Sequence, residues 1–294
     1  MSCYQYIQEK KAQYPVSILC KVLTVSRSGF YNWQQKGSPL PGEKEDFLRL
    51  HIRAIHTQSR KTYGAPRITI ALRNQGIRVG HNRVARIMRE EGINGLPKKK
   101  YRKRSKPSQT PIEAPNILER NFETTAPNKA WVGDITYIWT TQGWLYLAVL
   151  IDLYSRRVVG WEARDNMETE LCLETLRKAL VLRSPAPGLI HHTDRGSQYT
   201  STAYLSQLSA AGLHKSLSRA GDCWDNAVAE SFFGTLKTEL IHRQVWKSRD
   251  QAREAIRDYI HNFYNPVRLH SANGGLSPIE AEWLDDKNKQ PIAA

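Results

Sequence analysis

Cysteines and long apolar runs are scarce in this sequence, and their scarcity excludes several classes of protein. Cys3, Cys20, Cys172 and Cys223 lie far apart, with no C-x-x-C spacing, whereas zinc ribbons and disulfide frameworks need paired cysteines. The longest apolar run covers only residues 145–151, and a membrane span needs about 20 apolar residues. The N-terminus lacks the basic-then-apolar pattern of a secretory signal. The sequence therefore predicts a cytoplasmic protein with reduced thiols and no membrane segment.

Acidic residues are also scarce, but only in one part of the chain. The formal net charge is +15, and residues 44–106 contain 18 Lys and Arg against 4 Asp and Glu. Residues 107–294 contain 20 Lys and Arg against 22 Asp and Glu. A generically basic surface would spread its charge more evenly, so this asymmetry favours a nucleic-acid-binding module attached to a nearly neutral body.

Two segments have the pattern of a helix-turn-helix. The first and weaker one places short helices at 16–23 and 28–33. The second begins a helix at Pro66, breaks at Gly76 and continues with a helix over 83–91. On this last helix an apolar stripe is backed by Arg83, Arg86 and Arg89. These arginines suit a DNA-reading helix, although an ordinary solvated helix face would have the same pattern.

A strongly basic stretch follows this helix-turn-helix. It is succeeded by Pro-, Ser- and Thr-rich sequence up to Pro127, which predicts an extended linker that tracks a phosphate backbone. The cations predicted to contact DNA here are Lys98, Lys99, Lys100, Arg102, Lys103 and Arg104.

From residue 129 onward the pattern changes to alternating strands and helices. Runs rich in β-branched and aromatic residues predict strands, and amphipathic stretches predict helices. Their order is strand 131–140, strand 145–151, strand 157–163, helix 168–182, strand 188–192, helix 201–211, strand 213–218 and helix 227–241. This order predicts a mixed α/β layer.

Three carboxylates stand out within this layer. Asp134 lies inside the first strand, and Asp194 directly follows the fourth. A charge in or at the end of an apolar strand is costly unless it is paired or binds a metal, and Mg²⁺ prefers carboxylate oxygen. At 100° per residue, Glu230 lies at the border of the buried face of its helix, with Lys237 on the same side. Singly they could be a strand-edge charge, a turn former and a solvated helix residue.

The sequence around these acids resembles a known family. The motifs are Trp131-x-x-Asp134-Ile135-Thr136-Tyr137, His192-Thr193-Asp194-Arg195-Gly196-Ser197, Asp225-Asn226-Ala227-x-x-Glu230 and the C-terminal Leu276-Ser277-Pro278. Together with the 35 residues that separate Asp194 from Glu230, they resemble the DDE transposases and retroviral-type integrases, and within them the insertion-sequence-three family of bacterial transposases. The resemblance covers roughly residues 50–284.

This resemblance implies an RNase H-like mixed-sheet α/β core preceded by an all-α helix-turn-helix region. It also implies a metal-dependent transposase that cleaves and transfers DNA strands at the ends of an insertion sequence. Asp134, Asp194 and Glu230 would be the catalytic ligands of two Mg²⁺ ions, with Mn²⁺ as a substitute, and Lys237 would contact DNA near the cut. Its partners would be double-stranded DNA of the element ends and target, and further copies of the chain in a dimer or higher oligomer, in the bacterial cytoplasm at the nucleoid.

The expected organisation has five parts. They are an N-terminal helical segment (1–43), a helix-turn-helix domain (44–96), a basic linker (97–128), the catalytic core (129–245) and a C-terminal helical extension (246–294). Family members are commonly fused to an upstream reading frame with a leucine zipper, and no long heptad run occurs here. Met1 is therefore expected to begin the downstream frame, with an upstream-frame product or fusion as a further partner.

Two rival functions remain open on the sequence. One is a nuclease of the same fold that cuts DNA without joining it. The other is a DNA-binding regulator that uses residues 50–106 and carries an inert C-terminal body. The nearby Asp152, His191 and His192 are interpreted as turn, positioning or packing residues rather than metal ligands.

Overall fold

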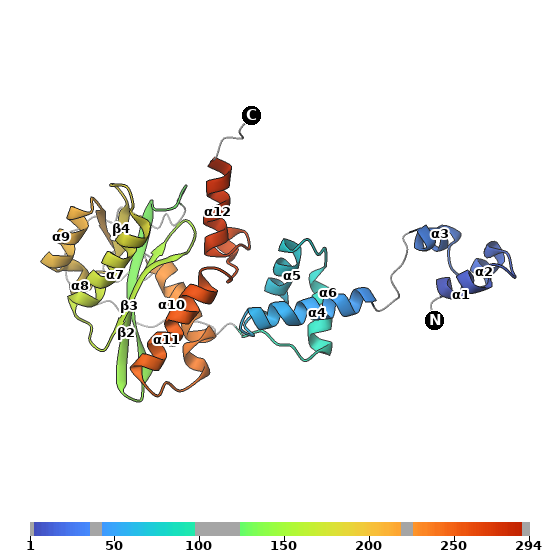
Figure 1. Cartoon of the computed structure of the whole chain (residues 1–294), viewed down its shortest axis with the longest axis horizontal. Coiled ribbons are helices and arrows are strands. Elements are labelled where there is room, and N and C mark those ends of the chain that lie inside the picture. The colour runs from blue at the N-terminus through green and yellow to red at the C-terminus, as the bar shows by residue number, and fades with distance from the viewer. Residues whose placement is uncertain (1–2, 36–42, 98–123, 219–225, 290–294) are drawn as a thin grey trace.

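The computed structural model describes residues 3–35, 43–97, 124–218 and 226–289. Two helical units come first (Figure 1). The first consists of α1 (Cys3–Lys10), α2 (Val16–Val22) and α3 (Arg27–Gln35), which pack around Ile7, Leu19 and Phe30. The second consists of α4 (Glu43–Gln58), α5 (Ala65–Asn74) and α6 (His81–Glu90). Both expected helix-turn-helix pairs are helical as predicted, within two residues at each end.

The helix α4 was not predicted, although its sequence carries a usable signal. Leu48, Ile52 and Ile55 recur at helical spacing and are buried. They pack with Ile68 and Leu72 of α5 and with the apolar stripe of α6, so that α4 completes the core of the second unit. The α5 helix begins at Ala65 with a proline in its first turn, where the missing N–H costs nothing.

Among the described residues, the catalytic-core region contains a sheet of five strands in the order β3-β2-β1-β4-β5. The strands β1, β2 and β3 pair antiparallel, whereas β4 pairs parallel with both β1 and β5. The five bounds are β1 (Ala130–Thr140), β2 (Gly143–Asp152), β3 (Val158–Arg164), β4 (Ile190–Thr193) and β5 (His214–Leu217). This is the mixed sheet expected from the sequence, and β4 begins two residues later than predicted because Gly188 turns the chain with φ +95°.

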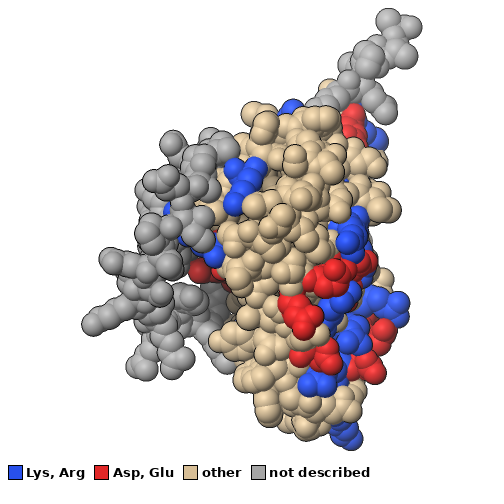
Figure 2. Space-filling model, turned by 90° about the vertical axis from the view of Figure 1, so that its left-hand side faces the viewer, with Lys and Arg blue, Asp and Glu red and all other residues tan. Residues whose placement is uncertain are grey.

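Helices cover the two faces of this sheet (Figure 1). One face packs against α7 (Thr169–Arg183), α8 (Ser197–Thr200) and α9 (Thr202–Ala210). The other face packs against α10 (Ala227–Glu239) and α11 (Arg249–Tyr259). On the α7–α9 side, charged residues gather mainly in one region where both signs intermingle (Figure 2). On α7, Arg177 pairs with Glu170 at 2.7 Å and with Glu174 at 3.3 Å.

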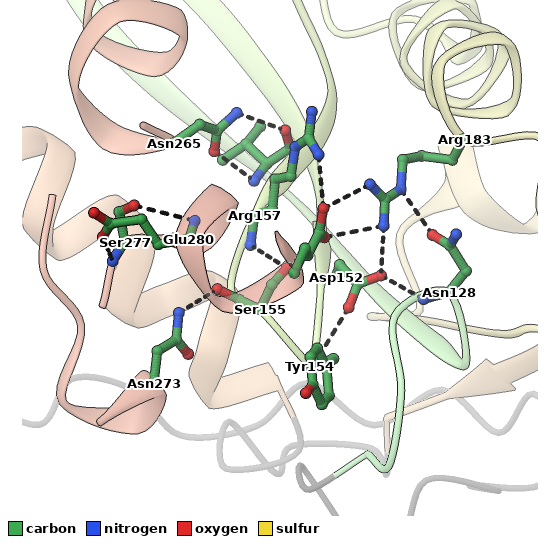
Figure 3. A network of polar contacts seen from close by, with 12 residues as sticks. Asn128, Asp152, Tyr154, Ser155, Arg157, Arg183, Asn265, Asn273, Ser277 and Glu280 are labelled. Carbon is green, nitrogen blue, oxygen red and sulfur yellow. Dashed lines mark hydrogen bonds and ion pairs between the residues drawn. The ribbon is translucent and has the colours of Figure 1, made fainter. Parts of the chain in front are cut away.

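A buried polar network attaches the C-terminal segment to the sheet (Figure 3). After α10 this segment contains the 3-10 helix η2 (Ile241–Arg243), then α11, the π-helix η3 (Ile260–Tyr264) and the 3-10 helix η4 (Ser271–Asn273). It ends with α12 (Pro278–Lys289). From α12, the Glu282 carboxylate accepts hydrogen bonds from Ser155 at 2.8 Å, Arg157 at 2.6 Å and Arg183 at 2.8 Å. Asp152 is fully buried and accepts from the backbone N–H groups of Asn128 and Tyr154. Asp152 therefore holds the β2–β3 turn, which fits its predicted role.

The second helical unit also contacts the C-terminal segment and α10. The Tyr63 hydroxyl accepts a hydrogen bond from the Leu269 N–H at 2.7 Å, and Asn74 donates to the Gly275 carbonyl at 3.0 Å. Arg67 forms an ion pair with Glu239 of α10 at 3.3 Å. These contacts join α5 to the helix that carries Glu230. No helix among the described residues is long and apolar enough to cross a membrane.

Candidate active site

The parallel pairing of β1 and β4 brings Asp134 and Asp194 to the same edge of the sheet. Val132 pairs with His192, and β4 ends one residue later at Thr193. Continuing this register by two residues places Asp134 beside Asp194. A Cβ on Gly133 would lie 3.2 Å from the Thr193 side chain, so the two strands remain close up to this point. The two carboxylates therefore lie where the parallel ladder stops.

Each of these two carboxylates is held by a backbone amide. Asp134 Oδ1 accepts from the Ile135 N–H at 2.8 Å, and Asp194 Oδ1 accepts from the Gly196 N–H at 2.9 Å. A Cβ at Gly196 would approach Asp194 Oδ1 to 3.0 Å, so glycine leaves room for this turn. The side chains are thus oriented by local backbone geometry before any ligand binds.

Of the three carboxyl groups, Asp134 is the one whose pKa reflects both of the others. Burial and the negative charges of Asp194 and Glu230 raise its pKa to about 7, against the opposing effects of the Ile135 N–H and Lys237. Burial also raises the pKa values of Asp194 and Glu230. Raised pKa values mean that the ionised forms of these three carboxyl groups are disfavoured, and a bound cation would stabilise them.

Glu230 reaches this region from the first turn of α10. The apolar side of α10, with Ala229, Phe232, Phe233 and Leu236, is buried against the sheet and leaves Glu230 half-buried at its border. Asn226 immediately precedes the helix, and its side-chain amide donates to the Gly133 carbonyl at 3.2 Å. This bond ties the start of α10 to the residue before Asp134. Asn226 was not predicted as a site residue, although it shares the helical sector of Glu230.

Lys237 places a cation on the same side of α10. Its ammonium lies 5.2 Å from the centre of the Tyr137 ring. Burial lowers its pKa, and the charge of Asp134 opposes this shift. Among the described residues, no group of three His, Cys, Asp or Glu side chains already forms a metal cluster. The structure therefore brings Asp134 and Asp194 side by side, and Glu230 and Lys237 into electrostatic range of Asp134.

Comparisons with known proteins identify the family. An integrase core domain model matches residues 124–223, a second integrase core domain model matches 230–282, and an HTH-like domain model matches 43–101. The Escherichia coli K12 protein "Transposase InsF for insertion sequence IS3A" is 40% identical over 289 residues, covering 97% of this chain and 99% of that protein. The chain belongs to the IS3 family of insertion-sequence transposases. It is therefore a DDE-type polynucleotidyl transferase, as its motifs indicate.

Other relatives agree with this assignment. The Shigella sonnei "Insertion element IS600 uncharacterized 31 kDa protein" is 42% identical over 260 residues, covering 88% of this IS3-family chain and 96% of that protein. Among solved structures, the catalytic core of HTLV-2 integrase in complex with magnesium, in its trimeric form, aligns with a TM-score of 0.44 and 16% identity, covering 54% of this chain and 99% of that one. This structural likeness is too low to assign anything further.

His191 and His192 of the transposase core are packing residues. His191 contacts the Tyr204 hydroxyl at 2.6 Å, and His192 contacts the Ser216 hydroxyl at 2.8 Å. Both are buried. Burial and the neighbouring His192 lower the pKa of His191 to about 3, so His191 is neutral at physiological pH. These contacts agree with the packing interpretation of His191 and His192.

The predicted DNA-contacting arginines of α6 are exposed, but two of them already have partners. Glu45 of α4 lies 3.0 Å from Arg86 and 3.6 Å from Arg83. Arg86 also pairs with Glu90 at 2.7 Å. Arg89 is exposed on the same helix. The predicted contacts Lys98, Lys99, Lys100, Arg102, Lys103 and Arg104 lie outside the described residues.

Proposed function

We propose that this chain cleaves DNA at the ends of its insertion sequence and joins the freed strands to target DNA. Asp134, Asp194 and Glu230 are assigned as the catalytic carboxylates. The observation that carries this assignment is the β1–β4 register, which sets Asp134 beside Asp194 while the charge of Glu230 acts on Asp134. Family membership gives the class of reaction, and this geometry supports the assignment of these three residues as catalytic.

The carboxylates fit a site for two Mg²⁺ ions, with Mn²⁺ as a substitute. Their oxygens are the hard donors that these ions prefer. The raised pKa of Asp134 reflects its burial and the repulsion by Asp194 and Glu230, which bound cations would relieve. Since no ready-made group of three ligands occurs among the described residues, we infer that Glu230 moves toward the two aspartates when the ions bind.

The protein's own residues then orient the reactants. Bound divalent cations would supply activation of the attacking water or 3′-hydroxyl and stabilisation of the leaving oxygen. Asp134 and Asp194, fixed by the Ile135 and Gly196 amides, hold their oxygens in place. Lys237 contributes positive charge beside them, where a scissile phosphate would lie.

We assign DNA binding to the helical region and the basic linker that follows. In this proposal the domain spans 44–96, α6 contacts DNA through Arg83, Arg86 and Arg89, and the linker 97–128 tracks the backbone through its cations. The N-terminal segment (1–43), the core (129–245) and the extension (246–294) complete the chain. Because two element ends must be held at once, we propose a dimer or higher oligomer on nucleoid DNA, with an upstream-frame product as a further partner.

The decisive experiment measures cleavage and joining of labelled DNA that carries the source element's ends, with Mg²⁺ present. Wild type is compared with Glu230→Gln and with the control Glu254→Gln, which changes an exposed glutamate on α11. We expect joined products from wild type and from the control, and their loss in Glu230→Gln while DNA binding persists.

The rival functions predict different results. Cleavage without joining by wild type would favour a nuclease. Binding without chemistry, unchanged in Glu230→Gln and after fusion to the upstream frame, would favour a regulator. Activity that appears only in the fusion would assign the missing step to the upstream product.

A further inference from the structure

Three large aromatic side chains lie exposed on the β1–β2 hairpin. Tyr137, Trp139 and Trp144 have exposed fractions of 58%, 59% and 42%. The Trp144 ring lies 5.2 Å from that of Tyr137 and 4.8 Å from that of Trp139, nearly perpendicular to both. Exposed indoles are costly in water, so a cluster of this kind marks an interaction surface. We call these three residues the aromatic ridge.

Strand geometry places the ridge on one face of the hairpin. Tyr137 and Trp139 alternate along β1 with the buried residues Ile138 and Thr140, and Trp144 is the register partner of Trp139. The short strand β4 pairs with β1 only as far as Val132. Among the described residues, no strand pairs with this edge of β1 beyond Val132, so the edge of the hairpin next to Tyr137 and Trp139 has no neighbouring strand.

Two cations lie beside the residues of the aromatic ridge. The Lys237 ammonium lies 5.2 Å from the centre of the Tyr137 ring. At the hairpin turn, Arg249 Nε donates to the Trp144 carbonyl at 3.0 Å, which holds its guanidinium against the turn. Aromatic rings beside cations are the combination that single-stranded nucleic acid recognises, because bases stack on the rings and phosphates meet the cations.

We propose that the aromatic ridge stacks unpaired bases of the DNA strand that is held at Asp134. This inference rests on the proposed function and extends it to the state of the DNA. Tyr137 and Trp139 lie three and five residues beyond Asp134 on β1, about 10–17 Å along the strand, and their side chains project from the opposite face of the strand. Beyond Val132 no described strand pairs with this edge of β1. Lys237, whose charge acts on Asp134, lies 5.2 Å from the Tyr137 ring, so a DNA strand held at Asp134 reaches the ridge around this edge. At about 3.4 Å per stacked nucleotide, the ridge meets bases about three to five nucleotides from the cut.

A second copy of the chain fits this surface less well. In a two-fold contact the same patch faces itself, so Lys237 and Arg249 would each approach their own copies. Cross-strand aromatic pairing also stabilises hairpins. That role needs only the Trp139–Trp144 pair and accounts neither for the third ring nor for the bordering cations.

The test measures DNA affinity in EDTA, so that no chemistry occurs. Two probes are used: the fully paired end of the source element, and the same duplex with mismatched pairs placed at the estimated ridge position. Wild type should bind the mismatched probe more tightly, because its bases are already unpaired. Trp139→Ala should lose about 5- to 100-fold in affinity for the mismatched probe and little for the paired one.

Two matched variants keep the result interpretable. Trp139→Phe retains a stacking ring and should retain most of the preference. Trp283→Ala removes a tryptophan of similar exposure, 54%, from α12 and should change neither affinity. Equal losses on both probes, no loss at all, or a changed oligomeric state of Trp139→Ala without DNA would each overturn the proposal.

The failure of this proposal is separable from failure of the proposed function. Cleavage and joining by wild type in Mg²⁺ would uphold the transposase chemistry even if Trp139→Ala bound both probes normally. An inactive wild type that still preferred the mismatched probe, with the preference lost in Trp139→Ala, would uphold the aromatic ridge alone.

Discussion

Replacing Glu239 with glutamine should strongly destabilise the folded chain. The Glu239 carboxylate lies at the end of α10 and is almost fully buried. It accepts hydrogen bonds from Arg268 Nη2 at 2.8 Å, from the Tyr259 hydroxyl at 2.7 Å and from Arg67 Nη1 at 3.3 Å. Glutamine keeps the shape and one acceptor oxygen. It removes the negative charge that compensates the buried guanidinium of Arg268.

The expected loss of stability follows from the burial of both partners, Glu239 and Arg268. Glu239 and Arg268 side chains are 6% and 5% exposed, so water cannot replace the lost partner. Removing one member of such a pair costs about 3–5 kcal/mol of the free energy of unfolding. For a body of this size that corresponds to a fall in Tm of roughly 6–20 °C. Adding Arg268→Met should recover part of the loss, because it removes the unpaired charge.

Calorimetry and urea denaturation at several pH values provide the measurement. Burial alone would raise the pKa of Glu239, but the hydrogen bonds and charge of Arg268 lower it below its usual 4.5. A lowered folded pKa means that the stabilisation is present above pH 4.5 and is lost as the pH falls through the folded value. The difference between wild type and Glu239→Gln should therefore shrink in acid. If Glu239→Gln lowered the free energy of unfolding by less than about 1 kcal/mol at neutral pH, the pair would contribute no more than an exposed salt bridge, and this reasoning would be refuted.

Three further results are expected. Because the pKa of Asp134 is raised to about 7, metal-free wild type should lose stability as pH rises from 3.8 to about 7, by up to about 4 kcal/mol from this group. Asp134→Asn should remove this part of the loss, leave the part that Asp194 and Glu230 cause, and abolish the rise in Tm on adding Mg²⁺. An unchanged pH profile would contradict the assignment. Glu45→Gln should release Arg83 and leave Arg86 paired with Glu90 alone, tightening duplex binding severalfold with a steeper salt dependence, which a salt titration of the affinity measures. Asn226→Ala should cost only about 1 kcal/mol of stability but slow strand transfer tenfold or more by loosening α10 against β1, and equal rates in a single-turnover assay would disprove its positioning role.

Local pattern was sufficient for most of the elements. Alternation along β1 and the apolar stripes of α6 and α10 follow from nearest-neighbour geometry, so their positions were predicted to within a few residues. Spacing and motif also selected Asp134 and Asp194 as candidates. The register that sets them side by side depends on β4 pairing with a strand about 60 residues earlier, which no local pattern specifies.

Contacts between distant residues account for what the sequence did not predict. Glu282 meets Ser155 across 127 residues, and Glu239 meets Arg268 across 29. Nothing near either glutamate identifies its partner. The same holds for the aromatic ridge: Trp139 and Trp144 have strand-like neighbours, and nothing in the sequence near them shows that their rings stay exposed.

The attachment of α5 to α10 fixes the distance between the second helical unit and the carboxylates. Since Tyr63, Arg67 and Asn74 bond to residues of α10 and the C-terminal segment, the helix α6 and the carboxylate edge keep a constant separation. A base pair inserted between the recognised sequence and the cut would shift the phosphate by about 3.4 Å and rotate it by roughly 35° around the duplex. If α6 binds the element end as proposed, protein packing would count the position of the cut from the bound sequence, and the helical phase of the DNA would decide which phosphate reaches Asp134.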